Sequence, residues 1–193
     1  QEQSQVNLSN KILIKDISIN SKLVKKNDVF FAIKGKNVDG NNYVSEAIKK
    51  KSSFAIVNRL DNNHPLFKQI KVKNTLKFLT TCSSILRENI NARIISITGS
   101  CGKTTLKEMI GLILKKVSRT SFSPKSFNNK YGVPLSLFNM RQNDDFGVFE
   151  IGMDKKGEIN NLSKIIRPDL GVITNISYAH SKNFKNIKQI ADA

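Results

Sequence analysis

The chain has 193 residues, which is enough for one large domain or two small ones that each bury a core. Its hydrophobic fraction of 39% and charged fraction of 24% are typical of a globular protein, and no apolar run reaches the about 20 residues that cross a bilayer. Two cysteines and two histidines are too few for a disulfide scaffold or a structural zinc site. The polar start lacks the pattern of a secretory signal, so we expect a cytoplasmic protein. We also expect a monomer.

The net charge of +17 raises the question of a nucleic-acid partner. The lysines are spread along the whole chain, Trp is absent, and the Phe and Tyr residues do not alternate with basic ones as a stacking platform requires. A general bias toward Lys, Asn and Ile explains the excess charge, and we expect no nucleic acid. The charge would still attract anionic substrates.

The first half of the chain alternates short apolar strands with helical stretches. The predicted elements are strands at 29–33 and 54–57, and helices near 44–50 and over 76–86. The polar stretch 88–91 is interpreted as a linker. We therefore predict a first domain at 1–91 and a second at 92–193.

From Arg93 the pattern becomes a regular alternation of strands and helices. A β-branched strand at 94–97 runs into Gly99, and the next helix has apolar residues at helical spacing, namely Leu106, Met109, Ile110, Ile113, Leu114 and Val117. The later predicted elements are a helix at 134–139, strands at 146–151 and 170–173, and a helix over 159–166 that Pro168 ends.

This alternation predicts an α/β fold. We expect a small N-terminal α/β domain, followed by a mostly parallel sheet with helices on both faces. The chain stops at 191–193 inside a predicted helix, so we expect the second domain to be incomplete and the chain to be a piece of a longer protein.

A glycine-rich run, Thr98–Thr105, lies between a predicted strand and a predicted helix. Its two glycines let backbone N–H groups turn inward around a phosphate, and the helix start adds a partial positive charge. Lys103 would reach the β- and γ-phosphates, and the Thr104 hydroxyl would ligate Mg²⁺. The general P-loop pattern has a glycine where this chain has Ile97, so the loop is the tighter G-x-x-G-K-T-T form. The sequence predicts an ATP site at Gly99, Ser100, Cys101, Gly102, Lys103, Thr104 and Thr105.

Polar residues also follow two later strands, at the sheet edge where ligands of open α/β folds gather. Glu150 ends the strand at 146–149, where it would either hold a metal or be a solvated acid. His180 follows the strand at 170–173 by a short loop, where it would be either a ligand or a structural histidine. Cys101 is either a reactive thiol or a small residue that fills the loop.

Five stretches in chain order match the motifs of a known family. They are Asn20–Lys22 with Asn27–Gly35 and Asp39–Gly40; Thr98–Thr105 with Lys107–Glu108; Asn128–Asn129 with Gly132–Leu135; Glu150–Gly152 with Gly157–Ile159; and Pro168–Asp169 with Ile173–Ile176 and Ala179–His180. With these stretches the chain resembles the Mur ligases, which form amide bonds at the expense of ATP. It is most similar to the type that joins D-alanyl-D-alanine to UDP-MurNAc-tripeptide in peptidoglycan precursor synthesis.

The resemblance implies that the first domain holds the UDP of the substrate. The residues implied near it are Ser21, Lys22, Lys34, Gly35, Asp39 and Gly40, with Asn128 and Asn129 as substrate contacts in the second domain. Lys22 stands where the family usually has Arg, and a lysine cannot make the bidentate contact of an arginine. The resemblance also implies a Mg²⁺ site at Thr104, Glu150 and His180, and catalytic roles for Lys103, Glu150 and His180.

The implied reaction activates a carboxylate. The carboxylate at the end of the substrate peptide attacks the γ-phosphate of ATP and becomes an acyl phosphate, which the amine of D-alanyl-D-alanine then attacks. The family's third domain and a lysine shortly beyond the segment at 186–193 would be missing, so we expect nucleotide binding with little turnover. The alternatives are a related Mur-type or polyglutamate-type ligase and a basic P-loop protein that binds nucleic acid.

Overall fold

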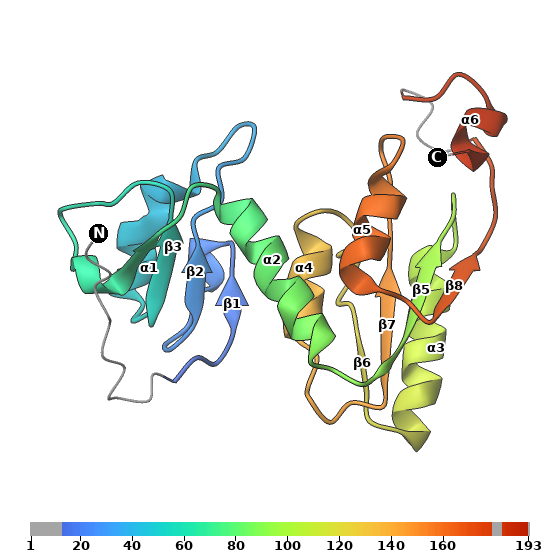
Figure 1. Cartoon of the computed structure of the whole chain (residues 1–193), viewed down its shortest axis with the longest axis horizontal. Helices are drawn as coiled ribbons and strands as arrows, with labels where there is room; N and C mark the ends of the chain where they lie inside the picture. The colour runs from blue at the N-terminus through green and yellow to red at the C-terminus, as the bar shows by residue number, and fades with distance from the viewer. Residues whose placement is uncertain (1–12, 179–182, 193) are drawn as a thin grey trace. The chain divides into compact units, whose positions relative to one another are not determined.

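The computed structural model describes residues 13–178 and 183–192 (Figure 1). The chain divides into two compact units at 78–79, inside the helix α2 (Thr75–Glu88). The boundary predicted at 91–92 lies just after the end of this helix. In the described ranges, no helix is both long and apolar enough to cross a membrane.

The first unit contains a parallel sheet in the order β1-β2-β3-β4. Its elements are β1 (Ile17–Ser18), η1 (Ser21–Leu23), β2 (Val29–Phe31), η2 (Gly40–Tyr43), α1 (Val44–Lys49), β3 (Phe54–Val57), η3 (Leu66–Lys68) and β4 (Gln69–Lys71). The predicted strand at 54–57 and the helix from residue 44 are confirmed. Strands β1 and β4 were not predicted, because each has only two or three residues without a continuous apolar run. The core unites Phe30 and Ala55 from the strands with Val44 and Ala47 from α1.

The second unit has a parallel sheet in the order β6-β7-β5-β8. Its elements are β5 (Arg93–Thr98), α3 (Lys103–Val117), β6 (Thr120–Phe122), α4 (Gly132–Phe138), β7 (Phe146–Glu150), α5 (Glu158–Ile166), β8 (Leu170–Ile173) and α6 (Ile187–Ala191). The predicted α/β class, with parallel sheets and helices, is confirmed.

The order of these strands creates a crevice between β5 and β7. After β5 the chain passes through α3 to the far strand β6, whereas after β7 it passes through α5 to β8 on the other side of β5. Helices α4 and α5 pack with Ile94 and Phe149 in one core, while α3 contacts β6 and β7. Adjacent strands whose connections leave in opposite directions open the sheet at their carboxyl ends, where open α/β folds bind ligands.

Only part of the apolar stripe that predicted α3 is shielded from solvent, namely the half-buried Leu106, Ile110 and Leu114. Met109, Ile113 and Val117 are exposed, the last of them by 80%, whereas Lys107 and Gly111 are buried. A Cβ atom on Gly111 would lie 2.7 Å from the ring of Phe122, so only glycine lets the helix approach β6 this closely. The periodicity therefore predicts the helix correctly, whereas its apolar stripe coincides with the buried face only in part.

A substitution at Gly132 tests how closely the start of α4 packs against the preceding loop. A Cβ atom there would lie 2.6 Å from the backbone Cα of Phe127, which cannot move aside as a side chain could. We expect Gly132→Ala to destabilise the second unit by about 1–3 kcal/mol in urea unfolding. Gly171→Ala is the matched control, because nothing lies within 4 Å of its added Cβ, and its effect should stay within about 0.5 kcal/mol. Equal effects of the two substitutions would contradict this packing.

Candidate active site

The glycine-rich loop between β5 and α3 has the backbone that its sequence predicts. Gly99 has a φ of +131° and Gly102 a φ of +78°, both in the range that favours glycine. A Cβ on Gly99 would lie 2.2 Å from the hydroxyl oxygen of Thr174, so this position excludes any other residue. Gly102 is the N-cap of α3 and has no side chain to cap the helix. The first amides of α3 therefore lack a helical acceptor, which suits them to an anion.

The segment after β8 supports the loop from one side. The side-chain oxygen of Asn175 accepts from the amide of Cys101 at 3.0 Å, and its backbone carbonyl accepts from the amide of Ser100 at 2.9 Å. The Thr174 hydroxyl donates to the carbonyl of Cys101 at 2.6 Å. Two loop amides thus bond to protein, so a phosphate would bind to amides closer to the helix start. Cys101 is exposed, and its sulfur accepts a hydrogen bond from the side-chain amide of Asn175 at 3.0 Å.

Lys103 folds back on the loop that precedes it. Its Nζ donates to the carbonyl of Gly99 at 2.6 Å. The ammonium therefore lies along the loop, where the phosphates of a nucleotide would be held, and not toward distant solvent. That Lys103 reaches the β- and γ-phosphates stays a prediction.

Glu150 lies at the centre of a hydrogen-bonded cluster. Its Oε2 accepts from the Thr104 hydroxyl at 2.7 Å, and its Oε1 accepts from the side-chain amide of Asn128 at 2.7 Å. The Ser126 hydroxyl lies 3.4 Å from that of Thr104. Glu150 is 1% exposed, so the alternative of a solvated acid is wrong. Since β7 alternates its side chains, Glu150 points to the same face as Val148, toward α3.

The metal set predicted from the sequence is only partly placed. Thr104 and Glu150 are adjacent, whereas His180 lies outside the described residues. In the ranges 13–178 and 183–192, no group of three or more His, Cys, Asp or Glu side chains could hold a metal. A hydroxyl and a carboxylate are nevertheless hard oxygen ligands of the kind that Mg²⁺ prefers.

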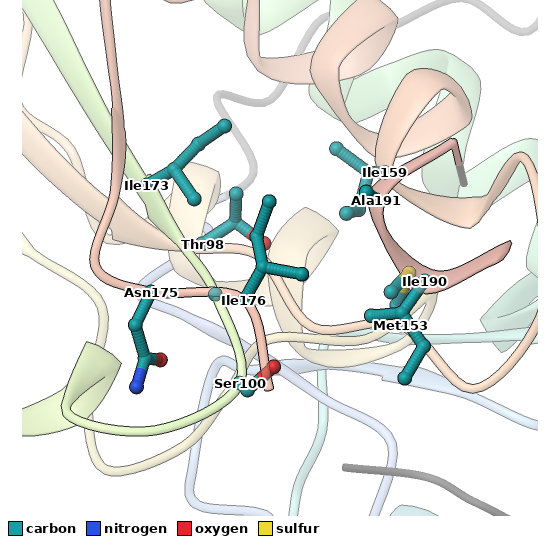
Figure 2. Close-up of a pocket in the computed structure, with 10 residues that line it drawn as sticks. Thr98, Ser100, Met153, Ile159, Ile173, Asn175, Ile176, Ile190 and Ala191 are labelled. Atoms are coloured by element: carbon teal, nitrogen blue, oxygen red, sulfur yellow. The ribbon is translucent and has the colours of Figure 1, made fainter. Parts of the chain in front are cut away.

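An apolar cavity of about 70 Å³ borders the other side of the loop. Figure 2 shows Thr98 and Ile176 facing Ile159 and Met153 across it. Ile190 from α6 also lines it.

The predicted UDP residues lie at the carboxyl edge of the first sheet, in two clusters that follow β1 and β2. In the first cluster, the Ser21 hydroxyl donates to Glu46 at 2.7 Å, and the Lys50 ammonium donates to the carbonyls of Ser21 and Lys22 at 3.0 and 2.7 Å. Lys50 also forms an ion pair with Glu46 at 3.2 Å, and of these two partners the hydrogen bond from Ser21 lowers the pKa of Glu46 most.

The second cluster is a tight hairpin after β2. Lys34 and Asp39 form an antiparallel bridge, and the amide of Gly35 donates to the carbonyl of Val38 at 2.8 Å. Gly40 lies against the backbone of the preceding strand end, since a Cβ there would be 2.6 Å from the backbone nitrogen of Ile33. The carboxylate of Asp39 accepts from the side chain and backbone of Asn41.

Several residues of these clusters were not identified from the sequence. Ser126 lies beside a predicted asparagine pair but is a common loop residue, while Asn175 falls in a matched family stretch but was given no role. Glu46 and Lys50 lie on a short helix that looks solvated. The side-chain oxygen of Asn129 accepts from the amides of Tyr131 and Gly132 at the start of α4, and the substrate contact that the resemblance implies for Asn129 stays a prediction.

Two family models match the chain and between them cover most of it. The model described as Mur ligase middle domain matches residues 97–193, just over half of the chain, and the one described as Mur ligase family, catalytic domain, matches residues 13–92. The chain belongs to the Mur ligase family.

Individual Mur ligases are similar over nearly the whole chain. The UDP-N-acetylmuramoyl-tripeptide–D-alanyl-D-alanine ligase of Rickettsia prowazekii is 36% identical over 97% of this chain and 42% of its own length. The crystal structure of MurF from Acinetobacter baumannii has a TM-score of 0.86 at 35% identity, covering 93% of this chain and 40% of its own. MurF from Thermotoga maritima in complex with ADP has a TM-score of 0.82 at 31% identity, covering 95% and 42%. The chain therefore spans about two fifths of the length of these Mur ligases.

The Asp39 cluster of this Mur ligase chain has a measurable electrostatic consequence. Hydrogen bonds from Asn41, first from its side chain and then from its backbone, lower the pKa of Asp39. Because the pKa of Asp39 is lower in the folded state, its carboxylate stabilises the fold at pH values above the usual aspartate pKa of about 4. This stabilisation is lost as the pH falls through the lowered pKa. In an NMR titration we expect Asn41→Ala to raise the Asp39 pKa, whereas Asn37→Ala in the same hairpin should leave it unchanged. An unaltered Asp39 titration in Asn41→Ala would be evidence against this hydrogen-bonded cluster.

Proposed function

We propose that this chain binds ATP and Mg²⁺ at the loop of 99–105, and that it contributes the phosphate-activating part of an amide-bond ligase. The observation that supports this most is the bond from Thr104 to a fully buried Glu150 beside a glycine loop that opens a helix. A buried carboxylate that accepts two hydrogen bonds is held in one orientation, in which it would receive a cation.

Thr104 and Glu150 would hold Mg²⁺, with His180 as the further ligand that the family resemblance implies. The two described side chains fit the ion, because both present oxygen atoms, the kind of ligand that Mg²⁺ prefers. When bound, Mg²⁺ would neutralise phosphate charge. Asn128 would keep Glu150 oriented through its bond to Oε1.

We propose that the whole protein catalyses the reaction for which its relatives are named. This reaction joins D-alanyl-D-alanine to UDP-MurNAc-tripeptide. The substrate carboxylate attacks the γ-phosphate, which forms a C–O–P linkage and releases ADP. The amine of D-alanyl-D-alanine then attacks the acyl carbon, and inorganic phosphate leaves with the linking oxygen. The first step brings two anions together, and the Lys103 ammonium with the amides at the start of α3 would offset their repulsion.

The first unit would bind the UDP of that substrate at the carboxyl edge of its sheet. Its Lys34–Gly40 hairpin and the Ser21–Lys22 turn both follow parallel strands, and the edge carries the cations Lys22, Lys34 and Arg59. Cations spaced along a sheet edge suit a diphosphate. This assignment rests on the family resemblance and on the shared edge.

We expect Lys103→Ala to weaken ATP binding by more than about tenfold, or about 1.4 kcal/mol, because it removes the cation beside the loop. Isothermal calorimetry with Mg²⁺ and ATP measures this directly. Lys116→Ala is the control, since Lys116 is an exposed cation at the far end of the same helix. Equal affinities of the two variants would show that Lys103 does not contact the phosphates.

The relatives' activity belongs to proteins more than twice as long as this chain. We therefore expect residues 1–193 to bind ATP but to form little or no product from UDP-MurNAc-tripeptide and D-alanyl-D-alanine. A coupled assay for ADP release, with product detection by mass spectrometry, tests this. Robust ligation by this chain alone would overturn the expectation. ATP binding without any preference for UDP-linked peptides would instead favour another amide ligase.

A further inference from the structure

Lys107 is a buried cation for which the proposed chemistry has no use. It lies on α3 one turn after Thr104, and its side chain is 0% exposed. Lysine is almost never fully buried unless its ammonium has partners, because an unpaired charge in the interior is costly. The position therefore requires an explanation beyond packing.

The ammonium of Lys107 is bonded to the segment that follows β6. Its Nζ donates to the carbonyls of Ser123 and Lys125, at 2.6 Å each, and lies 2.7 Å from the carboxylate of Glu108. Lys125 has a φ of +48°, a conformation that residues other than glycine rarely adopt. The two hydrogen bonds from Lys107 thus fix a strained turn at a defined place beside α3.

That turn lies in the 123–128 segment, which contacts Glu150 at two points and Thr104 at a third. The amide of Glu150 donates to the Ser123 hydroxyl at 3.3 Å, and the Asn128 side chain donates to Oε1 of Glu150 at 2.7 Å. Ser126 lies 3.4 Å from the Thr104 hydroxyl. Helix α3 therefore acts on Glu150 from two sides, directly through Thr104 and indirectly through Lys107 and this segment.

We propose that Lys107 is a positioning residue, whose buried ammonium fixes the 123–128 segment so that Asn128 and Ser126 hold Glu150 and Thr104 in the arrangement that receives the metal–nucleotide complex. The inference rests on the proposed nucleotide function. It assigns Lys107 no contact with the nucleotide itself. Its contribution is orientation, in the way that outer residues orient the ligands of a metal.

Methionine separates this role from simple packing. Lys107→Met keeps the volume of the aliphatic stem and removes the charge, so a residue needed only for packing would tolerate the change well. A residue needed for its two directed hydrogen bonds would not. Lys116→Met is the matched control, because it makes the same substitution at an exposed position of the same helix.

The first experiment is ADP binding by calorimetry, with Mg²⁺ and separately with EDTA. We expect Lys107→Met to weaken binding about tenfold with Mg²⁺ and less than about twofold with EDTA. Lys116→Met should match the unmodified chain in both buffers. Equal losses of affinity in the two buffers, or no loss, would overturn the proposal, because neither result reflects a specific effect on the Thr104–Glu150 metal site.

A double-mutant cycle asks whether Lys107 acts through Asn128. If it does, Asn128→Ala alone should produce a Mg²⁺-specific loss, and combining it with Lys107→Met should add little. Losses that multiply would show independent action and overturn the proposal. If Lys107→Met does not fold by circular dichroism, Lys107→Gln replaces it in both experiments with the same expectation and the same refuting outcome.

Hydrogen exchange tests the role of Lys107 without any nucleotide, and so independently of the proposed function. In Lys107→Met, the amides of 123–128 should exchange faster while those of β5 stay protected. If the unmodified chain binds no ADP in either buffer, the nucleotide function fails, and exchange still decides the role of Lys107. Unchanged exchange at 123–128 would then overturn it.

Discussion

The parallel pairing of β5 with β7, in a register that sets Ile97 beside Glu150, is the constraint on which the second unit depends. Because the two strands end at the same height, the acid of one lies next to the glycine loop of the other. Thr104, at the first turn of α3, then reaches the carboxylate at 2.7 Å. A register shift of one residue would turn Glu150 to the opposite face of the sheet, where α4 and α5 pack, and would bury an unpaired carboxylate in an apolar core.

The third contribution to this edge comes from β8. Strand β8 pairs with β5 on the side away from β7, and the residues after it bond to the loop at Ser100 and Cys101. The loop is thus supported on one side by Asn175, while Glu150 lies on the other. Most of these contacts use the side chains of Ser100, Thr174 and Asn175, so the shape of the loop depends on these residues as well as on glycine at position 99.

In the first unit, the parallel strands of a second sheet also bring polar residues together at one edge. Its strands are also parallel, so the turns after β1 and β2 meet at one edge, and polar groups gather there. Each cluster pairs its acid, Glu46 or Asp39, with local donors. An overall charge of +17 then favours anions at both units, as a nucleotide and a nucleotide-linked substrate would require.

The amino-acid sequence alone determined the strand–loop–helix order, the tight glycine loop, Glu150 at a strand end and the family resemblance, because these depend on residues close together in the chain. The tertiary structure decided which face of α3 is buried and what Lys107 does. Helical periodicity identifies an apolar stripe, but the packed face follows from the close approach of Gly111 to Phe122. Likewise, the partners of the Lys107 ammonium are carbonyls 16 and 18 residues away, and no local pattern can reveal them.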